Sequence, residues 1–280
     1  MAIILGAMFG FENISYKFSA FSMFSDMGVL RDNYGRFRKG GRRRKHILLH
    51  SWNSPEGCER LARSEYKQAF FRLAHCYQAQ INPFYCGVAC AVTALNVLHL
   101  GKKKIPVQAN FSYQAHGVRM EYRLHSQLTV LNESTENIKR RIDIAPTLRE
   151  KNTQVLEEEF NPGLELHQVR SLLDHYGARV ELHYAAYHDE ENIALFTQRL
   201  KETLSCTKRL MIANFHGGYL GAGSKGHFST LAAYDEQSDS VLVLDTACHK
   251  NPWFWAPVRQ FYQAMHQGED GKMRGYLIVS

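Results

Sequence analysis

The sequence predicts an α+β fold in which helices of the N-terminal part pack against an antiparallel sheet. Three observations support this. A helix-start signal and a long apolar helix precede residue 101, amphipathic helical patterns follow at 161–177 and 190–205, and short apolar runs typical of strands gather after residue 208. Helices first and strands mostly in the second half are typical of α+β domains.

The first two helices are predicted from local signals. A helix is expected from Ser54 to about Tyr66, because serine is a good N-cap residue and the proline that follows suits the first helical position. The Asn-Pro turn at 82–83 precedes 86–100 (CGVACAVTALNVLHL), which is apolar on nearly every side. We therefore expect this second helix to be buried in the core.

The rest of the chain is interpreted in the same way. Residues 102–160 are polar, charged and weakly patterned, which favours a surface subregion or insertion over a separate domain. In 161–177 the apolar residues share one helical face, Gly177 ends that helix, and a strand begins at Val180. Another helix is expected at 190–205. Four further strand candidates follow: 209–215, 226–234, 241–247 and 275–280.

The charge of the chain is concentrated in one short window. The 280 residues are 45% hydrophobic and carry a formal net charge of +7, but residues 31–46 hold eight Lys/Arg and one Asp. Outside this window 26 basic and 26 acidic residues balance. We interpret 1–46 as an N-terminal extension and 47–280 as one domain. The basic window is expected to make weak contact with anionic surfaces and no specific contact with nucleic acid.

The sequence contains no apolar run of the roughly 18–20 residues that a membrane span needs. Its apolar N-terminus lacks a basic region and a clear cleavage site, so a signal peptide is not favoured. The six cysteines lack paired CxxC spacing, which indicates reduced thiols. We therefore expect a cytoplasmic protein, with an exported or periplasmic protein as the alternative.

Cys86 is the strongest candidate for a nucleophile. It opens the apolar helix, where unpaired N–H groups and the helix dipole stabilise a thiolate. From local sequence alone, a buried structural cysteine is the commoner role. The candidate gains weight from His227 and Asp245, on strands joined by the turn-rich stretch 235–240. Pairing about this turn would place them nearly opposite, where the carboxylate could orient the imidazole that activates the thiol.

Gln80, six residues before Cys86, is a candidate oxyanion donor. Its side-chain amide and the backbone N–H of Cys86 could together stabilise a developing negative charge. A lone glutamine is usually a surface residue, and its place relative to Cys86 is what recommends it. The 14 histidines do not predict a metal site, because His183 and His188 have neither helix-face spacing nor nearby ligands in a convincing set.

In their order along the chain, these residues resemble those of the phytochelatin synthases, papain-like cysteine peptidases or transpeptidases that act on glutathione. The resemblance covers most of 47–280 and rests on Gln80-x5-Cys86-Gly87, Gly226-His227-Phe228-Ser229, Asp245 eighteen residues after the histidine, and Arg274-Gly275. No Cys-rich tail follows, so the chain looks like the short prokaryotic form, which is a catalytic domain alone.

The resemblance implies a papain-like fold for 47–280 and a role for each matched residue. Cys86 would be the nucleophile and His227 the general acid and base. Asp245 would orient the histidine, and Gln80 would be the oxyanion donor. The implied reaction is cleavage of the Cys–Gly bond of glutathione through a γ-glutamylcysteinyl thioester.

The resemblance also implies how the substrate is held. Arg274 and an acid just upstream would bind the α-carboxylate and α-amino group of the γ-glutamyl moiety, since these groups need one cationic and one anionic partner. Glu269 is the best match for this acid, and Asp270 is the alternative. Gly226 would border the same site. A heavy-metal ion, cadmium or zinc, would enter as the thiolate complex of glutathione, so no built-in metal site is required. A homodimer is retained as one assembly that the sequence leaves open.

The sequence departs from the family pattern at two places where an arginine is expected. Cys248 stands three residues after Asp245, and the loop 214–217 contains no arginine. Both changes remove positive charge from where an acceptor peptide would bind, so hydrolysis is expected to exceed transfer to a second glutathione. Cys90, one turn after Cys86, is either a resolving thiol or, as we favour, a small core residue.

Two other functions remain open from the sequence alone. The same catalytic residues could hydrolyse another peptide, an isopeptide or a glutathione conjugate. Alternatively, the domain could be the inert core of a basic protein that binds anionic surfaces through residues 31–46. Removal of 1–46 separates these functions, because only surface binding depends on the extension.

Overall fold

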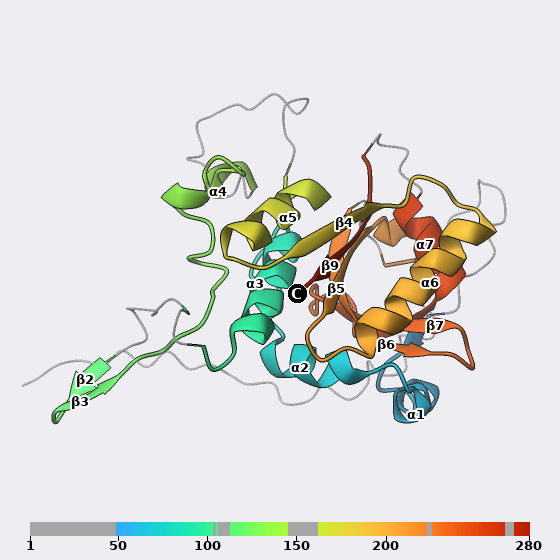
Figure 1. Ribbon diagram of the computed structural model, residues 1–280, viewed down its shortest axis with the longest axis horizontal. Coiled ribbons are helices and arrows are strands. Elements are labelled where there is room, and N and C mark those ends of the chain that lie inside the picture. Colours follow the sequence, from blue (N-terminus) through green and yellow to red (C-terminus); the bar gives the residue numbers. More distant parts are fainter. Residues whose placement is uncertain (1–48, 103–104, 106–112, 145–161, 223–225, 267–271) are drawn as a thin grey trace, which may run out of the picture. The chain divides into compact units, whose positions relative to one another are not determined.

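The computed structural model describes residues 49–102, 105, 113–144, 162–222, 226–266 and 272–280 (Figure 1). All of them belong to the unit His46–Ser280. The basic window 31–46 and Glu269 lie outside the described residues, so what the sequence predicts for them stays a prediction. Among the helices of the described part, none has the length and apolar character needed to cross a membrane.

Seven strands form one antiparallel sheet in the spatial order β1-β8-β7-β6-β5-β9-β4. They are β1 (His50–Ser51), β4 (Val180–Tyr184), β5 (Leu210–Phe215), β6 (His227–Asp235), β7 (Ser240–Asp245), β8 (Phe254–Pro257) and β9 (Gly275–Val279). Helices lie on both faces of the sheet (Figure 1). The central strands are therefore buried at every residue, which explains why their sequences are largely apolar rather than alternating.

The main helices are α1 (Pro55–Arg63), α2 (Gln68–Cys76), α3 (Cys86–His99), α5 (Leu166–His175), α6 (Glu190–Leu204) and α7 (Val258–His266). Shorter elements are the hairpin β2–β3 (Tyr113–Ala115 and Val118–Met120), η3 (Glu133–Thr135), α4 (Arg141–Ile144) and η6 (Gly217–Tyr219). The α+β class predicted from the sequence is confirmed.

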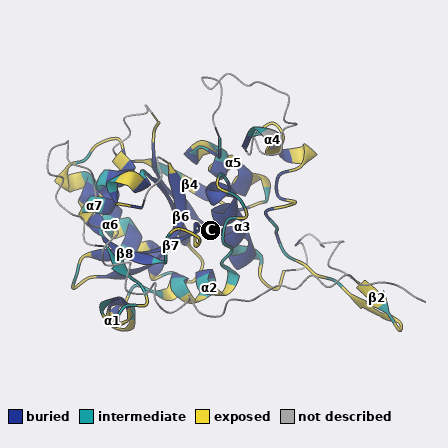
Figure 2. Cartoon of the chain, turned by 180° about the vertical axis from the view of Figure 1, so that it is seen from behind, coloured by how far each residue is buried: buried dark blue, intermediate teal, exposed yellow. Residues whose placement is uncertain are grey.

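Helix α3 is the central helix of the core. Every residue from Cys86 to Val97 is buried, and the helix packs against α2, α5 and β6 (Figure 2). A Cβ atom added at Gly87 would lie 3.0 Å from Val169 of α5 and 3.3 Å from Phe228 of β6. The glycine therefore allows the first turn of α3, and with it Cys86, to approach the sheet closely.

Local signals placed several element boundaries correctly. The Ser54 hydroxyl accepts a hydrogen bond from the N–H of Gly57 at 3.1 Å, as an N-cap residue does. Gly177, which follows α5, has a φ of +83°, the left-handed conformation that ends many helices and favours glycine. Strand β4 then begins at Val180, as predicted.

Four elements were not identified from the sequence: α2, α7, β1 and β8. In α2 an apolar residue, Phe71, faces solvent and weakens the amphipathic pattern. Strand β8 passes into α7 directly at Pro257–Val258, so no turn residues separate them. Strand β1 is two residues long and exists because it pairs with β8. Tertiary pairing, rather than local propensity, therefore defines β1.

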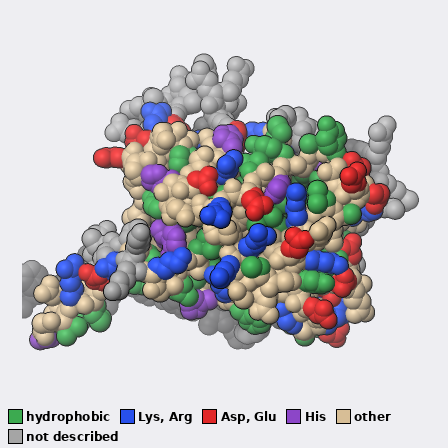
Figure 3. All heavy atoms as spheres, viewed as in Figure 1, with side chains coloured by type: hydrophobic (Ala, Val, Ile, Leu, Met, Phe, Trp, Pro, Cys, Tyr) green, Lys and Arg blue, Asp and Glu red, His purple; other side chains and the backbone are tan. Residues whose placement is uncertain are grey.

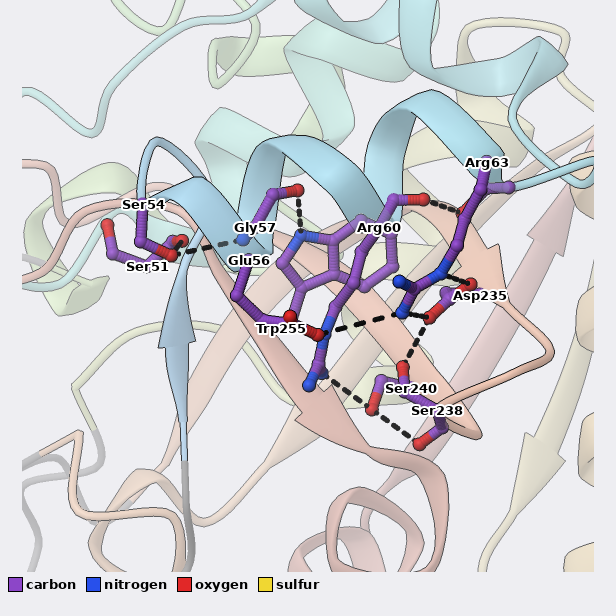
Figure 4. Close-up of polar contacts among 11 residues, drawn as sticks. Ser51, Ser54, Glu56, Gly57, Arg60, Arg63, Asp235, Ser238, Ser240 and Trp255 are labelled. Carbon is purple, nitrogen blue, oxygen red and sulfur yellow. Dashed lines mark hydrogen bonds and ion pairs between the residues drawn. The ribbon is translucent and has the colours of Figure 1, made fainter.

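A polar cluster joins α1 to one end of the β6–β7 hairpin (Figure 4). The guanidinium group of Arg63 donates two hydrogen bonds, of 2.9 and 2.7 Å, to the carboxylate of Asp235. Arg60 donates to Glu56 at 2.7 Å and to Ser240 at 3.1 Å. Burial opposes ionisation of Asp235, yet the Arg63 contact holds its pKa below the ordinary value. The cluster thus fixes α1 at the end of β6 opposite His227, about 27 Å away along the strand.

Charged side chains of both signs are intermixed on the face shown in Figure 3. Lysine and arginine do not gather there into one basic patch, and acidic side chains lie among them. This mixed face agrees with the even balance of charges outside 31–46. This face therefore offers an anionic partner no continuous basic patch.

The polar stretch 102–160 contributes to the core in its described part. His125 and Gln127 are 4% and 3% exposed, and Val130, Leu131 and Ile144 are buried as well. Asn96 of α3 holds this segment by donating to the backbone carbonyl of His125 at 3.0 Å and accepting from its N–H at 2.8 Å. The segment around His125 is therefore attached to the helix that carries Cys86.

A histidine pair fastens the same segment to the end of α3. Nδ1 of His99 lies 3.0 Å from Nε2 of His125, and the ring of His125 meets the Tyr176 ring edge-on. Burial lowers the pKa of both histidines, to about 4 for His125, and Lys102 lowers that of His99 further. Both rings are therefore neutral at neutral pH.

We expect the free energy of unfolding to fall as the pH drops from about 6.5 to about 4. In this window the unfolded chain binds a proton at His125 and the folded chain does not. The contribution of the neutral His125 to the free energy of unfolding is therefore complete above pH 6.5 and is lost on acidification. The loss approaches about 1.4 kcal/mol per pH unit. Denaturant unfolding of the wild type and of His125→Phe at several pH values checks this. If the free energy of unfolding depended equally on pH in the two proteins, the prediction would be contradicted.

Candidate active site

Cys86 lies at the N-terminus of α3, directly after a tight turn. The turn is held by Asn82, whose side chain accepts from the N–H of Phe84 at 2.9 Å and whose carbonyl accepts from the N–H of Tyr85 at 3.2 Å. Tyr85 is the N-cap residue and Cys86 the first residue of the helix. Cys86 is 8% exposed, and its thiol accepts hydrogen bonds from the N–H groups of Gly87 and Phe228, which favour a negative charge.

His227, the first residue of β6, bridges Cys86 and Asp245. Its Nε2 lies 2.5 Å from Oδ1 of Asp245, and the Cys86 thiol hydrogen-bonds to its side chain. Burial disfavours charge on all three groups. The hydrogen bonds outweigh it, lowering the pKa of the Cys86 thiol and raising that of His227. Both shifts favour a thiolate beside an imidazolium, the arrangement that suits a cysteine nucleophile and its proton donor.

His227 and Asp245 are not directly opposite each other in the β6–β7 pair, because the residue opposite Asp245 lies two positions after His227. Asp245 pairs with Ser229, and the register shifts between Leu231 and Ala233, so that Ala232 is an extra residue in β6. His227 and Ser229 share one face of the strand, since side chains alternate. Asp245 thus reaches His227 diagonally on the same face. Without the bulge, Asp245 would pair with Thr230 and face the other way.

Asp245 is fully buried and held at both carboxylate oxygens. Oδ1 also accepts from the N–H of Ala247 at 2.8 Å, and Oδ2 accepts from the side chain of Asn251 at 3.1 Å. Tyr77 donates its hydroxyl to the Asp245 carbonyl at 2.6 Å. Burial raises the pKa of Asp245, but His227 and these donors bring it below the ordinary value. Asn251 and Tyr77 escaped the sequence analysis, because their roles depend on tertiary proximity.

Gln80 is anchored to Thr246, the residue after Asp245. The Gln80 N–H donates to the Thr246 carbonyl at 2.9 Å, and the Thr246 hydroxyl donates to Oε1 of Gln80 at 3.2 Å. Nε2 of Gln80 donates to the carbonyl of Asn82 at 2.8 Å. A side-chain amide nitrogen carries two protons, so this bond uses one of them. The structure therefore places Gln80 at the end of the strand that carries Asp245.

The predicted substrate-binding residues are described in part. Arg274 is buried at 3% exposure, directly before β9, and its carbonyl accepts from the N–H of Ala185 at 2.9 Å. A Cβ atom added at Gly226 would lie 4.0 Å from the Arg274 guanidinium group. Arg274 thus reaches the residue that precedes His227. Glu269 falls outside the described residues, and its role stays a prediction.

Cys90 gives no second nucleophile beside Cys86. Cys90 is completely buried, and burial raises its pKa well above the ordinary value, as suits a small core residue. Cys248 is an exposed free thiol in the loop after β7. Within the described part of the chain, no group of three or more His, Cys, Asp or Glu side chains is arranged to hold a metal ion.

Comparison with known proteins gives consistent matches. A family model described as phytochelatin synthase matches residues 45–276. Among curated proteins, the chain is similar to glutathione gamma-glutamylcysteinyltransferase 3 of Lotus japonicus, with 27% identity over 215 residues, covering 76% of this chain and 38% of that protein. Glutathione gamma-glutamylcysteinyltransferase 1 of Arabidopsis thaliana is 25% identical over 215 residues, covering 76% of this chain and 37% of that protein.

The family model spans the described unit from before β1 into β9, and so includes Cys86, His227 and Asp245. The chain spans less than two-fifths of the length of these curated relatives. Since the family model covers most of its residues, the chain belongs to the phytochelatin synthase family.

Proposed function

We propose that the protein is a papain-like cysteine transpeptidase and peptidase that cleaves the Cys–Gly bond of glutathione. The observation that carries the proposal is the buried series in which the Cys86 thiol is hydrogen-bonded to His227, whose Nε2 lies 2.5 Å from Asp245. A cysteine at the N-terminus of a buried helix, facing a histidine and an acid on an antiparallel sheet, is suited to acyl transfer. The names of the curated relatives support glutathione as substrate.

In the first step the Cys86 thiolate attacks the carbonyl carbon of the cysteinyl residue of glutathione. The oxygen becomes negatively charged, and the Cys86 N–H and the Gln80 amide stabilise it. The C–N bond then breaks, His227 gives its proton to the departing nitrogen, and glycine leaves. A γ-glutamylcysteinyl thioester remains on Cys86, while Arg274 holds the carboxylate of the γ-glutamyl group.

In the second step a nucleophile attacks the thioester. Neutral His227 takes a proton from water, the C–S bond breaks, and γ-glutamylcysteine leaves with Cys86 restored as the thiolate. If the amino group of a second glutathione attacks instead, the product is a longer peptide. We favour hydrolysis, because the loop after Asp245 carries Cys248 where an arginine would attract the anionic acceptor.

Mass spectrometry of glutathione incubated with the full chain tests the proposal. We expect glycine and γ-glutamylcysteine in equal amounts, with longer peptides as minor products that increase when cadmium or zinc supplies metal-bound glutathione. S-methylglutathione and ordinary dipeptides, run in parallel, report on the alternative substrates. If glutathione stays intact although Cys86 is shown by alkylation to be a reactive thiolate, the proposed function is wrong.

A further inference from the structure

Both the nitrogen and the oxygen of the Gln127 side-chain amide hydrogen-bond to the segment that carries Gln80. Its Nε2 donates to the carbonyl of Ala79 at 2.9 Å and to Oε1 of Gln78 at 3.3 Å, and its Oε1 accepts from the N–H of Ile81 at 3.2 Å. The orientation of the amide follows from these partners, because the reversed amide would place its oxygen against the Ala79 carbonyl. At 3% exposure, Gln127 makes these contacts out of water.

Gln127 bonds to backbone groups of the Gln80 segment that would otherwise need a neighbouring strand as hydrogen-bond partner. On one side of the segment, the N–H of Gln80 donates to the carbonyl of Thr246. On the other side, the groups of Ala79 and Ile81 point to Gln127, as alternating groups of an extended chain do. The segment is thus held between the end of β7 and a single side chain.

The position of Gln127 is itself tied to α3. Two residues earlier, the backbone of His125 is clamped by Asn96 at 3.0 and 2.8 Å. The N–H of Gln78 also donates to the hydroxyl of Thr93 at 3.2 Å. Helix α3 begins with Cys86, so the nucleophile and the clamp on the Gln80 segment rest on one rigid element.

We propose that Gln127 is a positioning residue for the oxyanion hole, acting by fixing the backbone on both sides of Gln80. This inference rests on the proposed function, because it assigns Gln80 the role of oxyanion donor. A donor must lie at a hydrogen-bond distance from the oxyanion before the reaction begins, and a displacement near 1 Å costs on the order of 100-fold in rate. Thr246 and Asn82 orient the Gln80 amide, and Gln127 sets the main chain from which that amide extends.

A double-mutant cycle of Gln127→Leu and Gln80→Ala tests this proposal, with glycine release from glutathione as the readout. Gln80→Ala is expected to lower kcat about 100- to 1,000-fold. Gln127→Leu should lower kcat about 10- to 100-fold with KM unchanged. Because Gln127 acts through Gln80, adding Gln127→Leu to Gln80→Ala should cost little more. Equal losses in both backgrounds would overturn the proposal.

Alkylation of Cys86 by iodoacetamide provides a second readout. This displacement forms no oxyanion, so Gln127→Leu should leave its rate and pH profile unchanged, whereas general damage to the site would alter both. Gln127→Glu, which keeps the size and the acceptor for Ile81, covers the case in which the leucine variant does not fold. It places an oxygen against the Ala79 carbonyl, so kcat should again fall with alkylation intact.

Arg63→Gln is the matched control for lost stability, because it breaks the pair with the buried Asp235 at the far end of β6. Its melting temperature should fall while kcat is retained. Normal kcat in Gln127→Leu, in an otherwise active enzyme, would overturn this inference alone. Failure of the wild type to release glycine, with Cys86 still readily alkylated, would overturn the proposed function and this inference with it.

Discussion

Cys86→Ala is expected to abolish glycine release from glutathione. The variant lacks the sulfur atom that accepts the acyl group, and water has no comparable activation in its place. In other enzymes with an activated nucleophile, its removal costs on the order of a million-fold in kcat. Release of glycine by the purified variant, followed by mass spectrometry against the wild type, measures the effect. Glycine release at the wild-type rate would show that another group performs the reaction.

Cys90→Ala is the control for this substitution. Cys90 lies one turn further along α3 and is completely buried, but its thiol is neutral, so activity should persist. The pH dependence of alkylation gives a second check on Cys86. Because His227 lowers the thiol pKa, the thiolate persists below the ordinary pKa of 9.0 and is lost only when acid protonates it. Alkylation that falls off with the profile of an ordinary thiol would contradict the ion pair.

Asp245→Asn is expected to lower kcat by about 100- to 10,000-fold, with a smaller effect on KM. The amide has nearly the shape of the carboxylate but lacks its charge, so it supports the imidazolium less. It also presents N–H groups to a site already filled with donors from Ala247 and Asn251. The pKa of His227 should fall toward its ordinary value, and the alkylation profile of Cys86 should shift with it.

Asp235→Asn is the matched control for Asp245→Asn. Both carboxylates are buried in the β6–β7 hairpin, but Asp235 pairs with Arg63 at the end opposite His227. Its loss should reduce stability and leave kcat and the alkylation profile unchanged. If Asp245→Asn behaved in the same way, Asp245 would be a structural acid, and the orientation of His227 would depend on other contacts such as the edge-on Phe215 ring.

The elements that the sequence predicted correctly carry strong local signals. A serine cap starts α1, a glycine ends α5, and the continuous apolar pattern identifies α3 as a core helix. Cys86 could be identified because the chemistry of a helix N-terminus is itself local. His227 and Asp245 could be paired because their strands are joined by a short turn. In each case the physical cause lies within a few residues of the feature.

Features that depend on distant residues could not be predicted in this way. The extra residue at Ala232 is invisible to a pattern of apolar positions, because every residue of β6 is buried. The contacts of Gln127 with residues 78, 79 and 81 join segments nearly 50 positions apart. Its polar surroundings suggested a surface residue, and only the folded chain shows that the amide is buried against backbone groups.

The bulge at Ala232 also determines which changes of chain length the β6–β7 hairpin can absorb. Removing this one residue would make the ladder regular and leave the pairs Leu231–Val243 and Ala233–Leu242 in place. A deletion within 228–231 that kept the bulge would instead reverse the face on which His227 lies relative to Asp245. Related chains can therefore differ by one residue between these two side chains and still align them, provided that the gap falls at the bulge.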